Sequence, residues 1–168
     1  RMKSKFLLKI LLPIVLFLTG NVLIAQTITT TGTLVAVNTT YGTASAETSF
    51  TVEGPGVLFT NGILVTAPTG YEVSLTSGSG FGPTVTAPLV VDNVPQVTVF
   101  VRLKADASVA GGPYAGNIVL SSAGALNTPL NFATVSSTVS PKPITISAPT
   151  IAPKVYNGTT AAGVITPG

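Results

Sequence analysis

Carboxylates are the side chains of this sequence that could do chemistry most readily, because it contains no histidine and no cysteine. Those two absences exclude most nucleophile–base pairs and all thiolate or imidazole metal sites. Two carboxylates could still cleave a glycosidic bond, one as the acid and one as the base or nucleophile. The sequence offers five acids: Glu47, Glu53, Glu72, Asp92 and Asp106.

These five acids show none of the clustering that such a site needs. Each lies on the polar face of a predicted strand or in a loop beside turn-forming residues, as solvated surface acids do. A calcium site would need several grouped oxygen ligands, and no D-x-D-x-D run occurs. We therefore expect a protein that is not an enzyme and that holds no metal and no cofactor.

Exposed aromatic side chains could instead bind a sugar by stacking. Tyr41 and Phe81 lie in predicted loops, where binding residues concentrate. Phe59 and Phe100 are further candidates, and Phe100 stands on the polar face of its predicted strand. The alternative is packing within a loop or, for Phe100, contact with a neighbouring module. We keep Tyr41, Phe81 and Phe100 as candidate ligand contacts, with surface glycans as the candidate partner.

The basic residues are concentrated at the start of the chain. Four of the eight lie in the first nine positions, and four follow later against the five acids, so the formal charge after position 9 is 4 − 5 = −1. Nucleic-acid binding usually needs a basic stripe that neutralises several phosphates. The chain keeps no such stripe, so we expect no nucleic acid as a partner.

The first 25 residues have the pattern of a secretory signal peptide. A basic start, RMKSK, precedes the apolar stretch FLLKILLPIVLFLTG, and Ala25 precedes a candidate cleavage site at Gln26. The alternative is an uncleaved membrane anchor, but the charge-free apolar run at 10–18 is short for a span of about 20 residues. We expect an exported protein, at the cell surface or extracellular, with no stable membrane span after cleavage.

The rest of the sequence reads as short strands separated by Gly, Pro, Asn and Ser. QVTVFVRLK shows this best, because its three valines and Leu103 share one face and Phe100 lies on the other. We expect this to be a central strand, whereas Pro88 marks its own strand as an edge or a bend. The predicted strands are 27–37, 47–53, 63–67, 71–77, 84–91, 96–104, 114–122 and 130–139.

Seven to eight short strands with turns every 8–12 residues or so predict an all-β fold, an Ig-like antiparallel β-sandwich over residues 26–139. Without cysteine, this sandwich must be stable through core burial alone. Tyr114 is either the tyrosine corner of such a domain or a core aromatic. Four prolines follow in SPKPITISAPTIAPK, so we interpret 140–143 as a Pro-rich linker and 144–147 as the opening of another module.

Several phrases carry a resemblance to a known family: YGTASAETSFTVEG, GILVTAPTGYEVSLTSGSGFGPTV, VFVRLKADASVAGGPYAGNIVLSSAG and STVSPKPITIS. Together they resemble an Ig-like domain of large exported surface proteins of Bacteroidetes-type bacteria, over residues 26–139. The resemblance implies a spacer or presentation module on secreted and cell-surface proteins. In that family the domain often precedes adhesin-like repeats or an enzymatic domain.

Residues 144–168 resemble a different unit, the start of the YDG-type repeat of bacterial surface adhesins. The stretch KVYNGTT carries the match through Lys154, Tyr156, Gly158, Thr159 and Thr160. Asn157 stands where aspartate is usual, and both residues tolerate a turn with positive φ. We expect the chain to stop inside this repeat.

The sequence therefore favours a non-catalytic structural or adhesin-like module of a secreted or cell-surface bacterial protein. Its role would be to space or display downstream domains, and its partners would be the neighbouring domains of the same polypeptide. The alternative is a carbohydrate-binding or accessory module of a secreted hydrolase. Exposed aromatics in loops are the feature that distinguishes this alternative.

Overall fold

The structure, a computed structural model, describes residues 26–55, 59–151, 153, 155, 158 and 165–167. The predicted signal peptide, residues 1–25, lies outside the described residues, as do most residues of the YDG-like match: Lys154, Tyr156, Asn157, Thr159 and Thr160. In the described part of the chain, no helix has the length and apolar character needed to cross a membrane.

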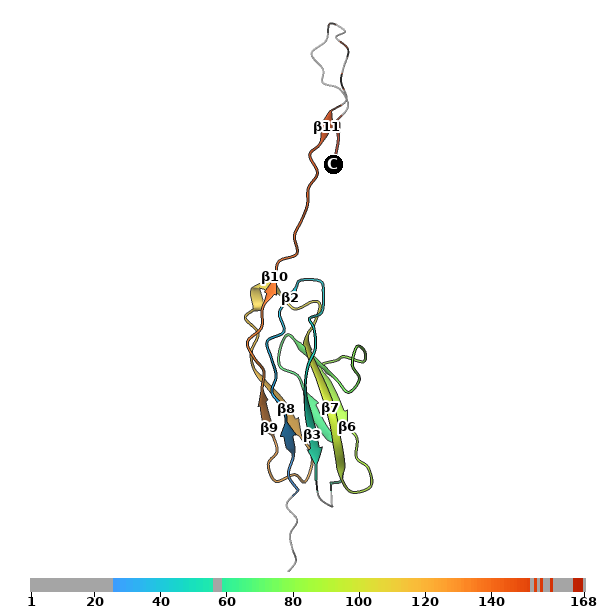
Figure 1. Ribbon diagram of the computed structural model, residues 1–168, viewed down its shortest axis with the longest axis vertical. Coiled ribbons are helices and arrows are strands. Elements are labelled where there is room, and N and C mark those ends of the chain that lie inside the picture. Colours follow the sequence, from blue (N-terminus) through green and yellow to red (C-terminus); the bar gives the residue numbers. More distant parts are fainter. Residues whose placement is uncertain are drawn as a thin grey trace, which may run out of the picture.

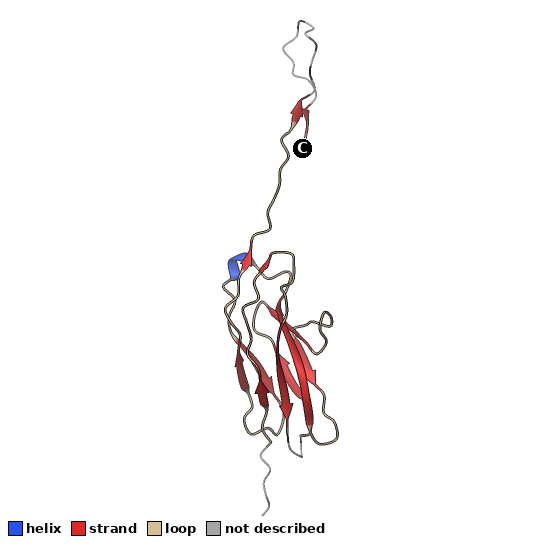
Figure 2. Ribbon diagram, in the orientation of Figure 1, coloured by secondary structure: helices blue, strands red, loops and turns tan. Residues whose placement is uncertain are grey.

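Two four-stranded antiparallel sheets pack against each other to form a β-sandwich (Figure 1 and Figure 2). This confirms the predicted all-β fold, and eight sheet strands agree with the predicted seven to eight. The first sheet has the order β1 (Thr29–Thr31), β3 (Thr48–Gly54), β7 (Val94–Leu103) and β5 (Tyr71–Ser74). The second has the order β6 (Thr84–Ala87), β4 (Ile63–Thr66), β8 (Asn117–Ser121) and β9 (Leu130–Ala133).

The strand order is Ig-like. In a constant-type Ig domain, strands A, B, E and D form one sheet and C, F and G form the other. Along this chain β1, β3, β4, β5, β7, β8 and β9 take positions A to G in turn, and β6 is an added strand beside β4. This added strand is at an edge and ends at Ala87, directly before Pro88, as the proline predicts.

The core lies between the two sheets and is built from alternate residues of each strand. Phe50 and Val52 on β3, and Ile118 and Leu120 on β8, are at most 2% exposed. Phe50 also stacks on Phe132 of β9, with 4.4 Å between ring centroids, and so joins the two sheets. Each such buried side chain stabilises the fold by roughly 1.5–3 kcal/mol. β7 lies inside its sheet, as its alternation predicts.

The two longest predicted strands are wrong in extent, because the chain leaves its first sheet well before the predicted end; β5 and β6 also end sooner than predicted, at Ser74 and Ala87. The predicted strand at 27–37 is reduced to β1, since Gly32, with a φ of 117°, turns the chain away from β3. The chain pairs again as β2 (Thr39–Thr40), which lies parallel to β10 (Val139–Ser140). The predicted strand at 130–139 is likewise divided into β9 and β10.

Two side chains that the sequence placed on the surface are buried. Phe59, a candidate exposed aromatic, is 2% exposed, and its ring packs so closely on Gly54 that a Cβ there would lie 2.7 Å from the ring. Ser74 follows the buried Val73 on β5, so strand alternation would place it on the polar face, yet it is also 2% exposed. The loop that follows β5 folds back over it, and its hydroxyl lies 2.6 Å from the carbonyl oxygen of Ser79.

Tyr114 is a tyrosine corner and a core residue at once. Its ring is 7% exposed, and its hydroxyl donates a hydrogen bond of 2.7 Å to the carbonyl oxygen of Ser108, six residues upstream. A bond from the tyrosine hydroxyl back to the upstream backbone defines the corner. Between the two residues lies the single short 3₁₀ helix η1 (Val109–Gly111) of the described chain. The bond fixes the turn that leads into β8.

Beyond the sandwich, the described residues form one small hairpin. Residues 141–149 form no strand, and they include residues 144–147, which we interpreted as the opening of another module. β11 (Thr150–Ile151) then pairs antiparallel with β12 (Ile165–Thr166). Gly158 lies between these strands with a φ of 78°, a left-handed conformation that suits glycine in a turn.

Candidate functional site

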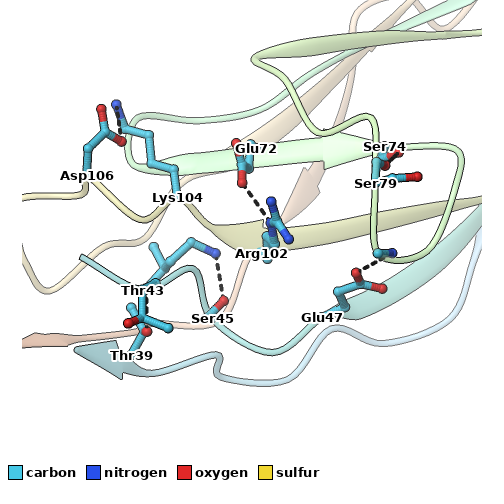
Figure 3. Close-up of polar contacts among 12 residues, drawn as sticks. Thr39, Thr43, Ser45, Glu47, Glu72, Ser74, Ser79, Arg102, Lys104 and Asp106 are labelled. Carbon is cyan, nitrogen blue, oxygen red and sulfur yellow. Dashed lines mark hydrogen bonds and ion pairs between the residues drawn. The ribbon is translucent and has the colours of Figure 1, made fainter. Parts of the chain in front are cut away.

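The polar cluster on the outer face of the first sheet is one of two candidate sites. Glu72 on β5 and Arg102 on β7 are register partners, and Arg102 Nε lies 2.7 Å from Glu72 Oε1 (Figure 3). Their side chains are 19% and 24% exposed, which corrects the expectation of a solvated acid at Glu72. Antiparallel pairing places the two side chains opposite each other, so the register itself creates the ion pair.

Phe81 completes this cluster from the loop between β5 and β6. The Arg102 guanidinium carbon lies 3.8 Å from the centre of the Phe81 ring, a cation–π contact worth roughly 0.5–2 kcal/mol. A sugar that stacks on an aromatic ring needs a free ring face, and the guanidinium covers one face of Phe81. Phe100, two residues before Arg102 on the same face, is half-buried. Arg102 therefore binds both Glu72 and Phe81 within the cluster.

The loop that carries Phe81 is held against the sheet by a carboxylate. Glu47 Oε1 accepts a hydrogen bond of 2.7 Å from Gly78 N (Figure 3). Glu47 Oε2 accepts one of 2.9 Å from the Ser77 hydroxyl. The Ser74 hydroxyl accepts a further bond from Thr76 N. The polar groups of this loop therefore form hydrogen bonds that stabilise the loop itself.

Tyr41 lies apart from the other two candidate contacts. It follows β2, is 46% exposed, and its neighbour Gly42 donates a backbone hydrogen bond to Ala105, beyond the end of β7. The structure therefore brings Phe81 and Phe100 to one sheet face, linked by Arg102, and leaves Tyr41 at the end of the sandwich. The three candidates do not form a common stacking platform.

A shallow groove of about 380 Å³ lies beside the cluster, lined by Pro68, Tyr71, Glu72, Pro83 and Lys104 among others. Both of its charged groups have partners, since Glu72 binds Arg102 and Lys104 Nζ lies 3.4 Å from Asp106. Within the described residues, no buried side-chain nitrogen or oxygen lacks a hydrogen-bond partner. The described groove residues therefore include no buried side-chain polar atom that lacks a partner.

Across the described ranges, no three Asp, Glu, His or Cys side chains are close enough to hold a metal ion. Glu47 and Glu72 are engaged by the loop and by Arg102, and Asp106 is paired with Lys104. Three of the five acids are therefore engaged by neighbouring groups of the fold.

The second candidate site is the end of the sandwich where the chain leaves it. We define the exit segment as residues 134–140, from the end of β9 through β10. Its centre is Ser137, which is fully buried. The Ser137 hydroxyl accepts a bond of 3.0 Å from Val37 N and donates one of 2.9 Å to the carbonyl oxygen of Val135. One side chain thus ties the N-terminal segment to the exit segment.

On its other side, the exit segment is held by hydrogen bonds to Tyr114 and Tyr71. The backbones of Ser137 and Tyr114 exchange two hydrogen bonds, of 2.8 and 2.9 Å. The Tyr71 hydroxyl lies 2.9 Å from the carbonyl oxygen of Val135 and 3.1 Å from that of Tyr114. Sequence reasoning missed this arrangement, because its partners are up to 100 residues apart and local alternation carries no sign of them.

Comparison of the chain with protein-family models, with curated proteins and with solved structures gives no match. The choice between a structural module and a carbohydrate-binding module therefore rests on the geometry of the two candidate sites. The side chains of the outer-face cluster bind one another, whereas the bonds of the exit segment hold the chain where it leaves the sandwich.

Proposed function

We propose that this chain is a non-catalytic structural module of an exported protein, at the cell surface or extracellular, that spaces or displays the domains that follow it. The observation that carries the proposal is the path of the chain. Residue 26 enters at one end of the sandwich, where its carbonyl oxygen accepts a bond from Leu126 N, and Ser140 leaves at the opposite end (Figure 1). Such a module adds the length of its strands to the polypeptide.

The resemblances support the same proposal. The sandwich resembles the Ig-like domains of Bacteroidetes-type exported proteins, and residues 144–168 resemble the start of a YDG-type adhesin repeat. A Pro-rich linker at 140–143 would limit bending at the joint, because proline restricts the backbone. Neighbouring domains of the same polypeptide are then the principal partners of this module.

Exchange of the sandwich in the polypeptide that carries it tests the proposal. Deletion of residues 26–140 should lower antibody access to a downstream epitope on intact cells. Replacement by an unrelated cysteine-free sandwich, with its termini at opposite ends, should restore that access, since a spacer acts through length and stiffness. If the replacement behaves like the deletion, the specific surface of this sandwich matters and the spacer role is wrong.

A carbohydrate-binding role is the competing function, and it depends on Tyr41 and Phe81. We expect the chain to give no saturable signal on a glycan array, because the Phe81 ring lies against Arg102 and Tyr41 stands alone. Binding that is lost in Tyr41→Ala or Phe81→Ala, and kept in Leu126→Ala, would instead establish a sugar site. Leu126 is the matched control because it is 75% exposed and lies at the entry end of the sandwich, where its backbone nitrogen donates a hydrogen bond to residue 26.

A further inference from the structure

We propose that the sandwich bears tension along its long axis, and that the bonds between the exit segment and residues 37–41 are the element that resists it. The inference rests on the proposed structural role, because a spacer transmits any force that acts on the modules it joins. It assigns to the exit segment a mechanical function beyond that of closing the fold.

The direction of the strands decides how tension acts. β2 and β10 are parallel, the chain reaches β2 from the entry end, and it leaves β10 at the exit end (Figure 1). A pull on residue 141 therefore tends to slide β10 along β2 instead of peeling the two apart. In sliding, all the bonds that cross between the segments are strained together.

Several hydrogen bonds cross between the two segments. They combine backbone pairing with side-chain bonds, and they lie along one short stretch of each segment. They are Val37 N to Ser137 Oγ (3.0 Å), Thr39 N to Thr138 O (3.0 Å), Tyr41 N to Ser140 O (2.9 Å) and Thr138 N to Asn38 Oδ1 (2.8 Å). Each bond alone contributes little net stability, so their simultaneous loading is what gives resistance.

Burial strengthens the centre of this contact. Ser137 is fully buried, and Tyr114 and Tyr71 hold the exit segment from its other side. Water cannot replace these bonds as they stretch, and a buried polar group left without a partner is expensive. The exit segment therefore detaches only when its bonds to residues 37–41 and its bonds to Tyr114 and Tyr71 break together.

Single-molecule pulling of the whole chain tests the inference, and the lack of native cysteine makes attachment unambiguous. The pair Thr27→Cys and Lys142→Cys pulls the exit segment along its neighbours. The pair Thr43→Cys and Lys142→Cys pulls apart the adjacent ends of β2 and β10. We expect the first pair to give a rupture force about twofold or more above the second, because the bonds break together and not in turn.

Two matched substitutions refine this test. Asn38→Ala removes an acceptor of two exposed bonds across the proposed element, from Thr138 N and from the Thr138 hydroxyl. Glu47→Ala removes an acceptor of two exposed bonds elsewhere, from Gly78 and Ser77. Asn38→Ala should lower the rupture force of the Thr27/Lys142 pair, and Glu47→Ala should leave it unchanged.

Equal rupture forces in the two geometries, or equal effects of the two substitutions, would overturn the inference. Neither result depends on the exchange of the sandwich described above. A successful exchange with equal forces leaves a spacer without this mechanical element, and a failed exchange with unequal forces leaves the mechanical element without the spacer role.

Discussion

Alanine at Gly70 is expected to lower the free energy of unfolding by about 3 kcal/mol or more. Gly70 has a φ of 85°, and a left-handed conformation costs a residue with a Cβ roughly 1–2 kcal/mol. The new Cβ would also overlap the Tyr114 ring, which is held in place by its bond to Ser108. Urea denaturation followed by circular dichroism measures the loss, which is a large share of the 5–15 kcal/mol or so of a typical domain.

Gly78→Ala is the matched control for this substitution. Gly78 has a similar φ of 79°, but a Cβ there meets no heavy atom within 4 Å. Its substitution should cost only the roughly 1–2 kcal/mol of the left-handed conformation. If the two substitutions cost the same, contact between Gly70 and the Tyr114 ring does not matter for stability, and the tyrosine corner is less rigid than its geometry indicates.

Phe50→Ala is expected to lower the free energy of unfolding by about 3–5 kcal/mol. The side chain is 2% exposed and stacks on Phe132 of the opposite sheet, so its loss leaves a cavity in the centre of the sandwich. Phe81→Ala should cost about 1 kcal/mol, since it removes only the contact with Arg102 on the outer face. Similar losses for the two phenylalanines would refute the placement of the core between the sheets.

Period-2 alternation was sufficient to predict most of this fold. Val99, Val101 and Leu103 were placed on one face from their spacing alone and are fully buried, and β7 was recognised as a central strand. Alternation works here because each strand has one face toward the core, so the sequence must mark that face. A separate signal, Pro88, predicted an edge or a bend, and β6 lies at the edge of its sheet.

Alternation could not reveal features that depend on distant parts of the chain. Phe59 is buried because Gly54 leaves room for its ring, and no local pattern reports that contact. The pairing of β2 with β10 joins segments about 100 residues apart, so neither partner marks the other. The cluster of Glu72, Arg102 and Phe81 required the strand register and the fold of a loop.

The pairing of β2 with β10 also orders events during synthesis. The N-terminal half of a chain emerges first and begins to fold before the rest exists. Residues 37–41 must wait for partners about 100 residues later, so Val37 stays uncovered until residue 137 has been made. Closing so long a loop is slow, and folds dominated by distant pairing take milliseconds to seconds. The last few residues of the sandwich therefore set the moment at which the nascent chain becomes resistant to proteases.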